Sequence, residues 1–390
     1  MTTTLPPVRL ASRLHSIPPF HVMELLARAH TLQAEGRDII HMEVGEPDFP
    51  TPAPVIAAAQ RFLATGQVRY TPALGLPALR EAISGFYATR FGAHVPAERI
   101  VITSGASGAL LLAIAALTNP GDEWLLTDPG YPCNRQFIQS FNGTVQTLPV
   151  NAESNFQPST SQVEQAWTGR TCGLLLASPS NPTGTLIDPD ALEQLAELAV
   201  KHGGALIVDE IYQGLVYGQE ASTVLSRRND VFVVNSFSKY FGMTGWRLGW
   251  LVVPEGYTRP VEMLAQHLFI SAPSPAQHAA LAAFSTENLL ILEERRGIFD
   301  ARRKALIDGL RSLGMGIDAE PAGAFYVYAN VSGLCVSSME FAHRLLEQAG
   351  VATTPGLDFG THKAQDYLRV AYTADIARIE EAISRMRSII

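Results

Sequence analysis

Short apolar runs alternate with longer helix-period stretches through the middle of the chain, and this rhythm constrains the fold more than any other feature. The runs are ERIVITS, EWLLTD, CGLLLAS, GALIVDE, DVFVVNS and RLGWLVV, all between residues 98 and 253. Strands that are apolar throughout and separated by helices are typical of a mostly parallel sheet covered on both faces. The pattern therefore predicts an α/β fold, with a three-layer αβα large domain.

The two chain ends have a different sequence pattern from the middle. Residues 1–50 are rich in proline and contain one helical pattern, from Phe20 to Glu35. Helix-period sequence returns near residue 286, followed by the short strands AFYVYANV and YLRVAYT and a closing helix that is apolar at every third or fourth residue: Ile376, Ile379, Ile383 and Met386. We expect a smaller α+β domain built from both ends, with residues 1–50 and 289–390 flanking a large α/β domain at 51–288.

Composition excludes several classes of protein. The chain has 390 residues, of which 47% are apolar, so a disordered protein is excluded. Its formal net charge of −8, without a basic run of five residues, argues against nucleic-acid binding. The apolar stretch Ala109–Leu117 is too short to cross a membrane, and the first residues lack the apolar core of a signal peptide. We expect a cytoplasmic protein that contacts no membrane.

The three cysteines, Cys133, Cys172 and Cys335, are odd in number and form no C-x-x-C pair. They predict free thiols rather than a disulfide framework or a cysteine zinc site, and we predict no metal centre. The P-loop, dinucleotide-binding and zinc-protease motifs are missing, and residues 105–108 miss the G-x-S-x-G pattern by one position. Phosphoryl transfer, hydride transfer and serine hydrolysis therefore have no support in these motifs.

Polar residues cluster where the predicted parallel strands end, which is where open α/β sheets bind their ligands. After one strand, residues 104–108 (SGASG) open a helix, and their small side chains would let a phosphate approach backbone N–H groups. Taken alone, that stretch is better explained by an ordinary helix capped by Ser104 after a glycine turn. After another strand comes Asn181, in the turn NPTG.

Two further strand ends carry charged residues. Asp209 ends the apolar strand LIVD and precedes Tyr212. A carboxylate there needs a cation or hydrogen bonds, although a helix cap is the simpler alternative. Lys239 follows the strand VFVVNS, where burial would lower its pKa and favour covalent chemistry with a carbonyl group. Ser236, Ser238 and Arg247 beside it could form a phosphate site.

One ligand accounts for all four strand ends: a phosphorylated pyridine aldehyde that forms an imine with a lysine. Four stretches carry a specific resemblance to a known family: SPSNPTG, VDEIY, SFSKYFGMTGWRLGW and VGEPDFPTP. The stretches RYTPALGLPALREAI, PGLDFG and YLRVAYT extend the likeness over essentially the whole chain. The sequence resembles the class I/II, fold-type I aminotransferases, which use pyridoxal 5′-phosphate.

The resemblance implies a role for each residue of the set. Lys239 would form the Schiff base, Asp209 would pair with the pyridinium N–H, and Tyr212 and Asn181 would bind the phenolic oxygen. Tyr131 would stack on the ring, and Tyr70 would reach the phosphate of the neighbouring subunit, which implies a homodimer. The remaining phosphate ligands would be Ser236, Ser238, Arg247, Ala106 and Ser107.

The substrate side of the site is implied in the same way. Arg369, in YLRVAYT, resembles the residue that binds the substrate α-carboxylate, with Asn181 beside it. Gly45, in VGEP, resembles the backbone position that lets the substrate approach. The implied reaction moves an amino group between an L-amino acid and a 2-oxo acid, with ping-pong kinetics.

Two alternatives stay open at this stage. A C–S β-lyase could use the same scaffold, because fold and cofactor do not fix the reaction. A sensor domain of a transcription regulator is disfavoured, because the residues before VGEPDF leave no room for a DNA-binding module.

The substrate is the least constrained part of the interpretation. A dicarboxylic substrate needs a second cation, and although Arg13, Arg37 and Arg135 lie in segments that could approach the site, none stands in a convincing pattern. The stretch SAPSPAQHAAL has neither arginine nor lysine, which favours a neutral, aliphatic or aromatic side chain. His15, Phe20 and Cys133 are candidates for the side-chain pocket, with packing or surface exposure as alternatives.

Overall fold

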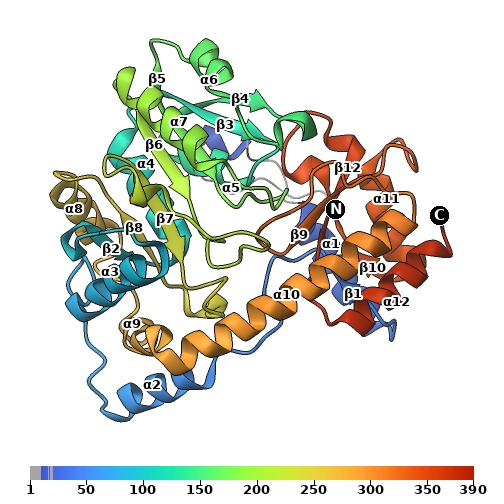
Figure 1. The fold of residues 1–390 in the computed structure, drawn as a ribbon, viewed down its shortest axis with the longest axis horizontal. Helices are drawn as coiled ribbons and strands as arrows, with labels where there is room; N and C mark the ends of the chain where they lie inside the picture. The colour runs from blue at the N-terminus through green and yellow to red at the C-terminus, as the bar shows by residue number, and fades with distance from the viewer. Residues whose placement is uncertain (1–9, 16, 18–20) are drawn as a thin grey trace.

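A computed structural model of the chain describes residues 10–15, 17 and 21–390. Its central element is a seven-stranded sheet with the order β2-β8-β7-β6-β5-β3-β4 (Figure 1). The five strands from β7 to β4 pair in parallel, and β8 runs antiparallel to both β7 and β2. The strands are β2 (Ile100–Thr103), β3 (Glu123–Asp128), β4 (Thr144–Pro149), β5 (Thr171–Ala177), β6 (Ala205–Asp209), β7 (Phe232–Ser236) and β8 (Gly249–Val252).

Helices cover both faces of this sheet, which confirms the predicted three-layer αβα arrangement. In β6, Leu206 and Val208 pack into a core shared with α3 (Pro77–Phe91) and α7 (Pro189–Lys201). Ile207, between them, packs into a second core. The second core includes residues of α4 (Gly105–Leu117), α5 (Cys133–Ser140) and α8 (Thr258–Leu268). Because alternate residues of a strand face opposite sides, the apolar run LIV is required by burial on both faces.

Local sequence sets where the covering helices begin. The Asp188 carboxylate accepts hydrogen bonds from the N–H groups of Asp190 and Ala191, and Pro189 occupies the first turn of α7. Both features favour a helix start at this point. The helix then buries an apolar stripe that includes Leu192, Leu195 and Ala199 against the sheet.

The two chain ends form two small sheets beside the large one. β1 (Ile40–His41) pairs in parallel with β10 (Val351–Ala352), and β11 (Thr354–Pro355), β12 (Tyr367–Ala371) and β9 (Tyr326–Asn330) form an antiparallel sheet. The helices around them are α1 (His21–Ala34), α10 (Thr286–Ser312), α11 (Ser338–Arg344) and α12 (Ile376–Arg387). The remaining helices are α2 (Ala53–Ala64), α6 (Thr160–Ala166) and α9 (Ser274–Ala280).

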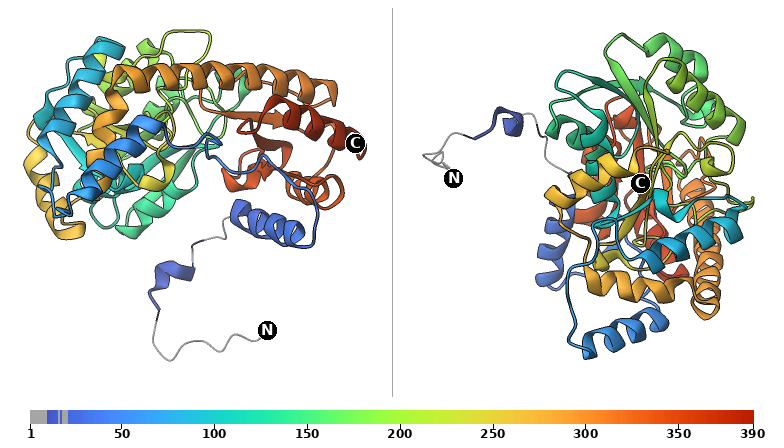
Figure 2. Two further views of the ribbon diagram at one scale, coloured as in Figure 1. Left: turned by 90° about the horizontal axis from the view of Figure 1, so that it is seen from below. Right: turned by 90° about the vertical axis from the view of Figure 1, so that its left-hand side faces the viewer.

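The helices foreseen at the chain ends are present, with small differences. Phe20, the expected first residue of the N-terminal helix, lies outside the described residues, and α1 is described from His21. In α12, Ile379, Ile383 and Met386 are buried, whereas Ile376, its first residue, is 39% exposed. The predicted division at residues 50 and 288 stays a prediction; its second limit lies in the first turn of α10, the helix that runs along both parts in Figure 2.

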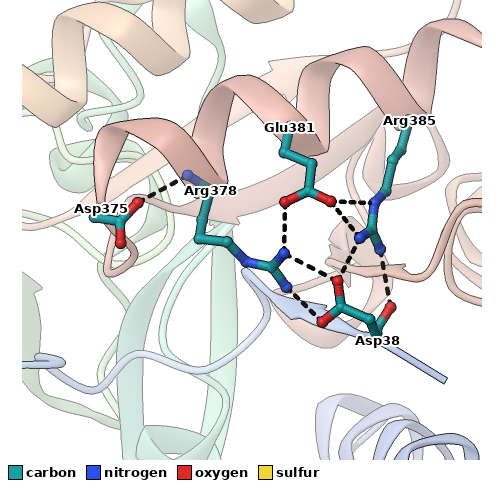
Figure 3. A network of polar contacts seen from close by, with 5 residues as sticks. All are labelled: Asp38, Asp375, Arg378, Glu381 and Arg385. Carbon is teal, nitrogen blue, oxygen red and sulfur yellow. Dashed lines mark hydrogen bonds and ion pairs between the residues drawn. The ribbon is translucent and has the colours of Figure 1, made fainter. Parts of the chain in front are cut away.

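An ion-pair network joins the N-terminal part of the chain to the C-terminal helix (Figure 3). The Asp38 carboxylate lies 2.7 Å from Arg378 Nη2 and also pairs with Arg385, and both arginines pair with Glu381. Hydrogen bonds from the two guanidinium groups lower the pKa of the Asp38 carboxyl to about 2. The network fixes Asp38, which lies just before β1, and Gly45 follows β1 in the chain.

Within the described ranges, we find no helix whose length and apolar character would allow it to span a membrane.

Candidate active site

A cavity of about 270 Å³ lies where β5, β6 and β7 end, and residues of the small sheets and of α1 close its other side. The structure brings most of the predicted site residues to its wall: Gly45, Ala106, Ser107, Tyr131, Asn181, Asp209, Tyr212, Ser238, Lys239, Arg247 and Arg369. Two predicted residues, Ser236 and Tyr70, are not among the lining residues.

Lys239 is the amine of the cavity. It follows β7, and its Nζ donates a hydrogen bond to the backbone oxygen of Gly45 at 2.5 Å. Burial, with the positive charge of Arg369 next in importance, lowers the pKa of Lys239 to about 8. A substantial share of the amine is therefore neutral near physiological pH, which is the form that reacts with a carbonyl group.

Asp209 is the buried carboxylate of the cavity, and it is 6% exposed. Its Oδ1 accepts a hydrogen bond from the N–H of Ile211 at 3.0 Å. Burial raises the pKa of Asp209 to about 6, an effect that this hydrogen bond and Lys239 partly oppose. The next residue, Glu210, faces away from the cavity, where its carboxylate binds Thr223 Oγ1 and the N–H of Val224. Asp209 is thus left available to a cationic or N–H group within the cavity.

One end of the cavity is suited to an anion. Ala106 and Ser107 lie in the first turn of α4, whose free N–H groups and dipole favour negative charge. Ser238 and Arg247 line the same cavity. Gly105 has a φ of +71°, and a Cβ there would lie 2.7 Å from Arg247 Nη2, so glycine permits the close approach of the guanidinium to the helix start.

Ser236 contacts Ser238, a residue at the anion-binding end of the cavity, without lining the cavity itself. It is 1% exposed, and its Oγ lies 2.9 Å from Ser238 Oγ and 3.1 Å from the backbone oxygen of Leu248. The structure therefore places Ser236 next to a lining residue rather than on the cavity wall itself.

Arg369 is a buried cation on β12, and its guanidinium contacts both parts of the molecule. Nη1 donates to Asn181 Oδ1 at 2.9 Å, and Nη2 donates to the backbone oxygen of Glu43 at 2.5 Å. The guanidinium carbon lies 4.3 Å from the centre of the Tyr326 ring. Arg369 Nε has no hydrogen-bond partner although it is buried, so this cation retains capacity for a ligand.

Tyr326 is a site residue that sequence reasoning missed. Its hydroxyl lies 2.8 Å from the hydroxyl of Tyr212, which is 4% exposed and whose pKa burial raises well above its ordinary value. A Cβ on Gly45 would lie 1.8 Å from the Tyr326 hydroxyl. The glycine is therefore needed for Tyr326 to reach the cavity. The run AFYVYANV predicts a strand but does not say which of its two tyrosines faces a ligand.

Tyr131 lines the cavity after β3, and burial raises the pKa of its phenol. Its neighbour Cys133 is half-buried and does not line the cavity. Tyr70 is 81% exposed, in the segment between α2 and α3, and lies away from this chain's own cavity wall.

Three apolar residues of α1 also line the cavity, and the sequence did not predict them: Val22, Met23 and Leu26. Glu43 also lines the cavity; it is fully buried, with Oε1 2.7 Å from His41 Nδ1. Of the other pocket candidates, Phe20 lies outside the described residues, and nothing is described of the His15 side chain.

The arginines considered for a second carboxylate are not among the residues described as lining the cavity. Arg13 donates to the backbone oxygen of Ser140, and Arg37 lies 3.9 Å from Glu347. Arg135 does not reach the wall either. The cations on the described part of the wall are Lys239, Arg247 and Arg369.

The donor set fits a phosphorylated pyridine aldehyde. The cavity contains an amine of lowered pKa, a buried carboxylate free to bind a ring N–H, and a helix start with a guanidinium for a phosphate. Among the described residues, no group of three or more His, Cys, Asp or Glu side chains could hold a metal ion.

Comparisons with known proteins agree with this geometry. The family model for "Aminotransferase class I and II" matches residues 37–386. A valine–pyruvate aminotransferase of Mycobacterium tuberculosis is 39% identical over 95% of this chain and 96% of the relative. An aspartate aminotransferase of Thermotoga maritima is 35% identical over 98% of this chain and 99% of the relative.

Solved structures give the same result. An aminotransferase from Mycobacterium tuberculosis is 38% identical, with a TM-score of 0.93 over 98% of both chains. The aspartate aminotransferase of Thermus thermophilus with maleate is 33% identical, with a TM-score of 0.92 over 98% of this chain and 100% of that structure's chain.

Proposed function

Because the chain belongs to the class I and II aminotransferases, an enzyme family that depends on pyridoxal phosphate, we propose that it moves the amino group between a neutral L-amino acid, aliphatic or aromatic, and a 2-oxo acid. The observation that carries this proposal is one cavity that combines Lys239, Asp209 and Arg369 with an apolar wall from α1. The first three residues serve the shared chemistry, and the wall selects the side chain.

Asp209 would hold the ring nitrogen of the cofactor, while Arg247, Ser238 and the first turn of α4 would hold its phosphate. Tyr212 and Asn181 would hold the phenolic oxygen, and Tyr131 would stack on the ring. When bound, pyridoxal phosphate supplies an aldehyde that bonds covalently to amines and a ring that withdraws electrons from the bond to be broken. Ser236 acts indirectly in this proposal, by orienting Ser238.

Lys239 has two tasks in this reaction. Its Nζ would hold the cofactor through a covalent bond to the aldehyde carbon, and the amine set free when the substrate binds would take the proton from the substrate Cα. Burial lowers the pKa of Lys239, which favours the neutral amine, the form that accepts a proton. Within the same half-reaction the Nζ would give this proton back on the cofactor side, and water would release the 2-oxo acid. Because the amino group would stay with the cofactor, the first product would leave before the second substrate binds.

Arg369 orients the substrate. Two parallel hydrogen bonds from a guanidinium hold a carboxylate in a fixed plane, which directs the Cα–H bond toward Lys239. Its contacts to Asn181 Oδ1 and to the backbone oxygen of Glu43 hold the guanidinium still, which supports this role.

Two observations support a neutral substrate side chain. The apolar wall of Val22, Met23 and Leu26 offers no partner for a charge, and each cation on the described wall already has a task. The relative from Mycobacterium tuberculosis named for valine and pyruvate favours the same class, whereas other relatives are named for aspartate. Aspartate therefore belongs in any substrate panel.

We also propose a homodimer in which Tyr70 reaches the neighbouring site. Its 81% exposure, away from its own cavity, and the exposure of Leu63 and Val68 in the same stretch of the chain support this. The test is complementation: coexpressed Tyr70→Ala and Lys239→Ala chains should regain activity that neither variant has alone, because one site of the mixed dimer is then intact. Absence of any regain would reject the shared site.

A cytoplasmic location is the remaining part of the proposal. The three cysteines are unpaired, as expected in a reducing compartment. Fractionation of cells that express the full chain would place it, and recovery outside the cytoplasm would contradict the proposal.

The deciding experiment is the absorbance spectrum of the holoenzyme before and after addition of single amino acids. Neutral aliphatic or aromatic amino acids should shift the cofactor band to that of the aminated form faster than aspartate does. A faster shift with aspartate would overturn the substrate class. Release of pyruvate and ammonia from a cysteine conjugate, without an oxo acid, would instead favour the C–S β-lyase reaction.

A further inference from the structure

The N-terminal half of α1 forms the apolar side of the cavity. Val22, Met23 and Leu26 lie within its first two turns and line the wall. Met23 is 54% exposed and Leu26 is half-buried, so these side chains are only partly held by the packing of the helix. The shape of this wall therefore depends on what fixes the start of α1.

The Asp358 carboxylate holds that start. Its Oδ1 accepts a hydrogen bond from the N–H of His21 at 2.8 Å, and its Oδ2 accepts one from the N–H of Val22 at 2.7 Å. The first N–H groups of a helix have no partner within the helix, and a carboxylate there also interacts favourably with the helix dipole. Asp358 is 7% exposed; burial raises the pKa of its carboxyl, and the two amide hydrogen bonds oppose that rise.

The loop that carries Asp358 is itself fixed to the large sheet. The Asp128 carboxylate, at the end of β3, accepts hydrogen bonds from Thr361 N at 2.9 Å and from Thr361 Oγ1 at 3.0 Å. The N–H of Gly130 donates to the backbone oxygen of Phe359 at 2.8 Å. A Cβ on Gly360 would lie 1.8 Å from Asp128 Oδ1, so glycine is needed for this close contact.

These contacts form a continuous connection from β3, through the loop at 358–361, to the first turn of α1. The later part of α1 is held differently, by an ion pair of 2.6 Å between Arg28 Nε and Glu347 Oε1. Asp358 thus acts on the turns that face the cavity, whereas Arg28 acts on the turns beyond it.

We propose that Asp358 is a positioning residue that fixes the apolar face of α1 against the cavity and so sets the selectivity for the substrate side chain. Asp358 does not line the cavity, and it acts through the helix. This inference rests on the proposed function, because it concerns the apolar side chain of that substrate.

The test uses the holoenzyme of the full chain and two readouts. Asp358→Ala should accelerate amide hydrogen exchange of residues 21–34 about tenfold, the order expected for loss of a helix cap. It should also lower the kcat/KM of leucine relative to alanine about tenfold, because the longer side chain loses contacts with α1 that alanine does not make. Asp358→Asn keeps one acceptor oxygen and should give an intermediate value for both readouts.

Asp375→Ala is the matched control. The Asp375 carboxylate accepts from the N–H of Arg378 in the first turn of α12, a helix whose residues do not line the cavity. This variant should accelerate exchange in residues 376–387 and leave the leucine-to-alanine ratio within about twofold of that of the wild-type enzyme.

A third comparison separates positioning from general destabilisation. In a Met23→Ala, Leu26→Ala background the apolar face is already lost, so Asp358→Ala should change the ratio little further. An undiminished further fall would mean that Asp358 does not act through α1, and the inference would be wrong.

Two other results would overturn the inference: unchanged exchange in residues 21–34, or an unchanged leucine-to-alanine ratio in Asp358→Ala. A wild-type enzyme that uses no neutral aliphatic or aromatic amino acid, leucine and alanine included, would reject the proposed substrate class instead. The exchange measurement, which needs no substrate, would then still decide whether Asp358 fixes α1.

Discussion

The two sides of the cavity are assembled in different ways. On the side of the large sheet, two functional groups have a partner two residues away, Ser236 with Ser238 and Asp209 with Ile211. Lys239 is the exception there, because its Nζ bonds to Gly45 of the chain-end side, 194 residues away. On the side formed by the chain ends, partners are far apart in sequence. The contact of Arg369 with Glu43 spans 326 residues, and that of His21 with Asp358 spans 337.

In the proposed function, this difference corresponds to a division between shared chemistry and substrate selectivity. The sheet side would supply the general chemistry through Lys239, Asp209 and the anion-binding end. On the chain-end side, Arg369 would bind the carboxylate that every amino acid has, and the apolar face of α1 would select the side chain. Substitutions on the sheet side should therefore affect all substrates alike, and those on the chain-end side should affect substrates differently or affect mainly binding.

The largest effect should follow loss of the amine on the sheet side. Lys239→Ala should lower turnover by about 10³-fold or more for every amino acid, because both the covalent and the proton-transfer tasks are lost. Rates for a panel of amino acids would measure this. Lys201→Ala is the control, because Lys201 is 67% exposed and pairs with Glu164 on the surface. A Lys239→Ala enzyme with wild-type turnover would overturn the whole assignment.

Asp209 and its neighbour Glu210 offer a matched pair of buried carboxylates. Asp209→Asn should lower kcat about 10²-fold, because the charge that stabilises a protonated ring nitrogen is lost. Glu210→Gln should act on stability instead, by about 1–3 kcal/mol, because its partners Thr223 and Val224 lie away from the cavity. Turnover and thermal unfolding of both variants distinguish the two. Equal losses of kcat would contradict the separation of their roles.

Arg369 lies on the chain-end side and bonds to Asn181 on the sheet side, so its substitution tests how the two sides act together. Arg369→Lys should lower kcat/KM about 10- to 100-fold, mainly through KM, because an ammonium cannot make two parallel hydrogen bonds to a carboxylate. The same change at Arg378, which lies outside the cavity, should leave steady-state kinetics near those of the wild-type enzyme. An unchanged KM in Arg369→Lys would remove this residue from the substrate site.

The smallest effect should come from the network in Figure 3, in which Asp38 is exposed and the other ion-pair partners are partly exposed, and which lies outside the cavity. Since the pKa of Asp38 is lowered to about 2 in the folded protein, the stability from this group is present above about pH 4 and is lost as the pH falls toward 2. Asp38→Asn should lower the Tm slightly at pH 7, and the difference from the wild-type protein should shrink as the pH falls. A constant difference across that range would show that the charge of Asp38 is not responsible.

The sheet side was largely predictable because its signals are local. The run LIVD indicates both a buried strand and the position of a carboxylate at its end, and the stretch SFSKYFGMTGWR holds an amine, two hydroxyl groups and a guanidinium within a few residues of another strand end. The parallel sheet then brings these ends together. Ser236 shows the limit of this reasoning, since its place behind Ser238 depends on side-chain directions within the turn.

The chain-end side was predictable only in part. The resemblance supplied Arg369 and Gly45, but Tyr326, Glu43 and the wall residues of α1 gave no distinct signal. The α1 pattern indicates an amphipathic helix, yet Val22, Leu25 and Ala29 would look the same in any helix packed on a core. Asp358, in PGLDFG, could equally be a surface carboxylate.

The sequence by itself determined the layers of the large sheet and the residues at its strand ends, because strand periodicity and strand-end chemistry are written in consecutive residues. Only the tertiary structure decided three contacts. The hydroxyl of Tyr326 bonds to that of Tyr212, Arg369 bonds to both Asn181 and Glu43, and Asp358 accepts hydrogen bonds from the first turn of α1. The physical reason is that these contacts join segments more than a hundred residues apart. Their formation depends on how two small sheets pack beside the large one, and no local pattern encodes that arrangement.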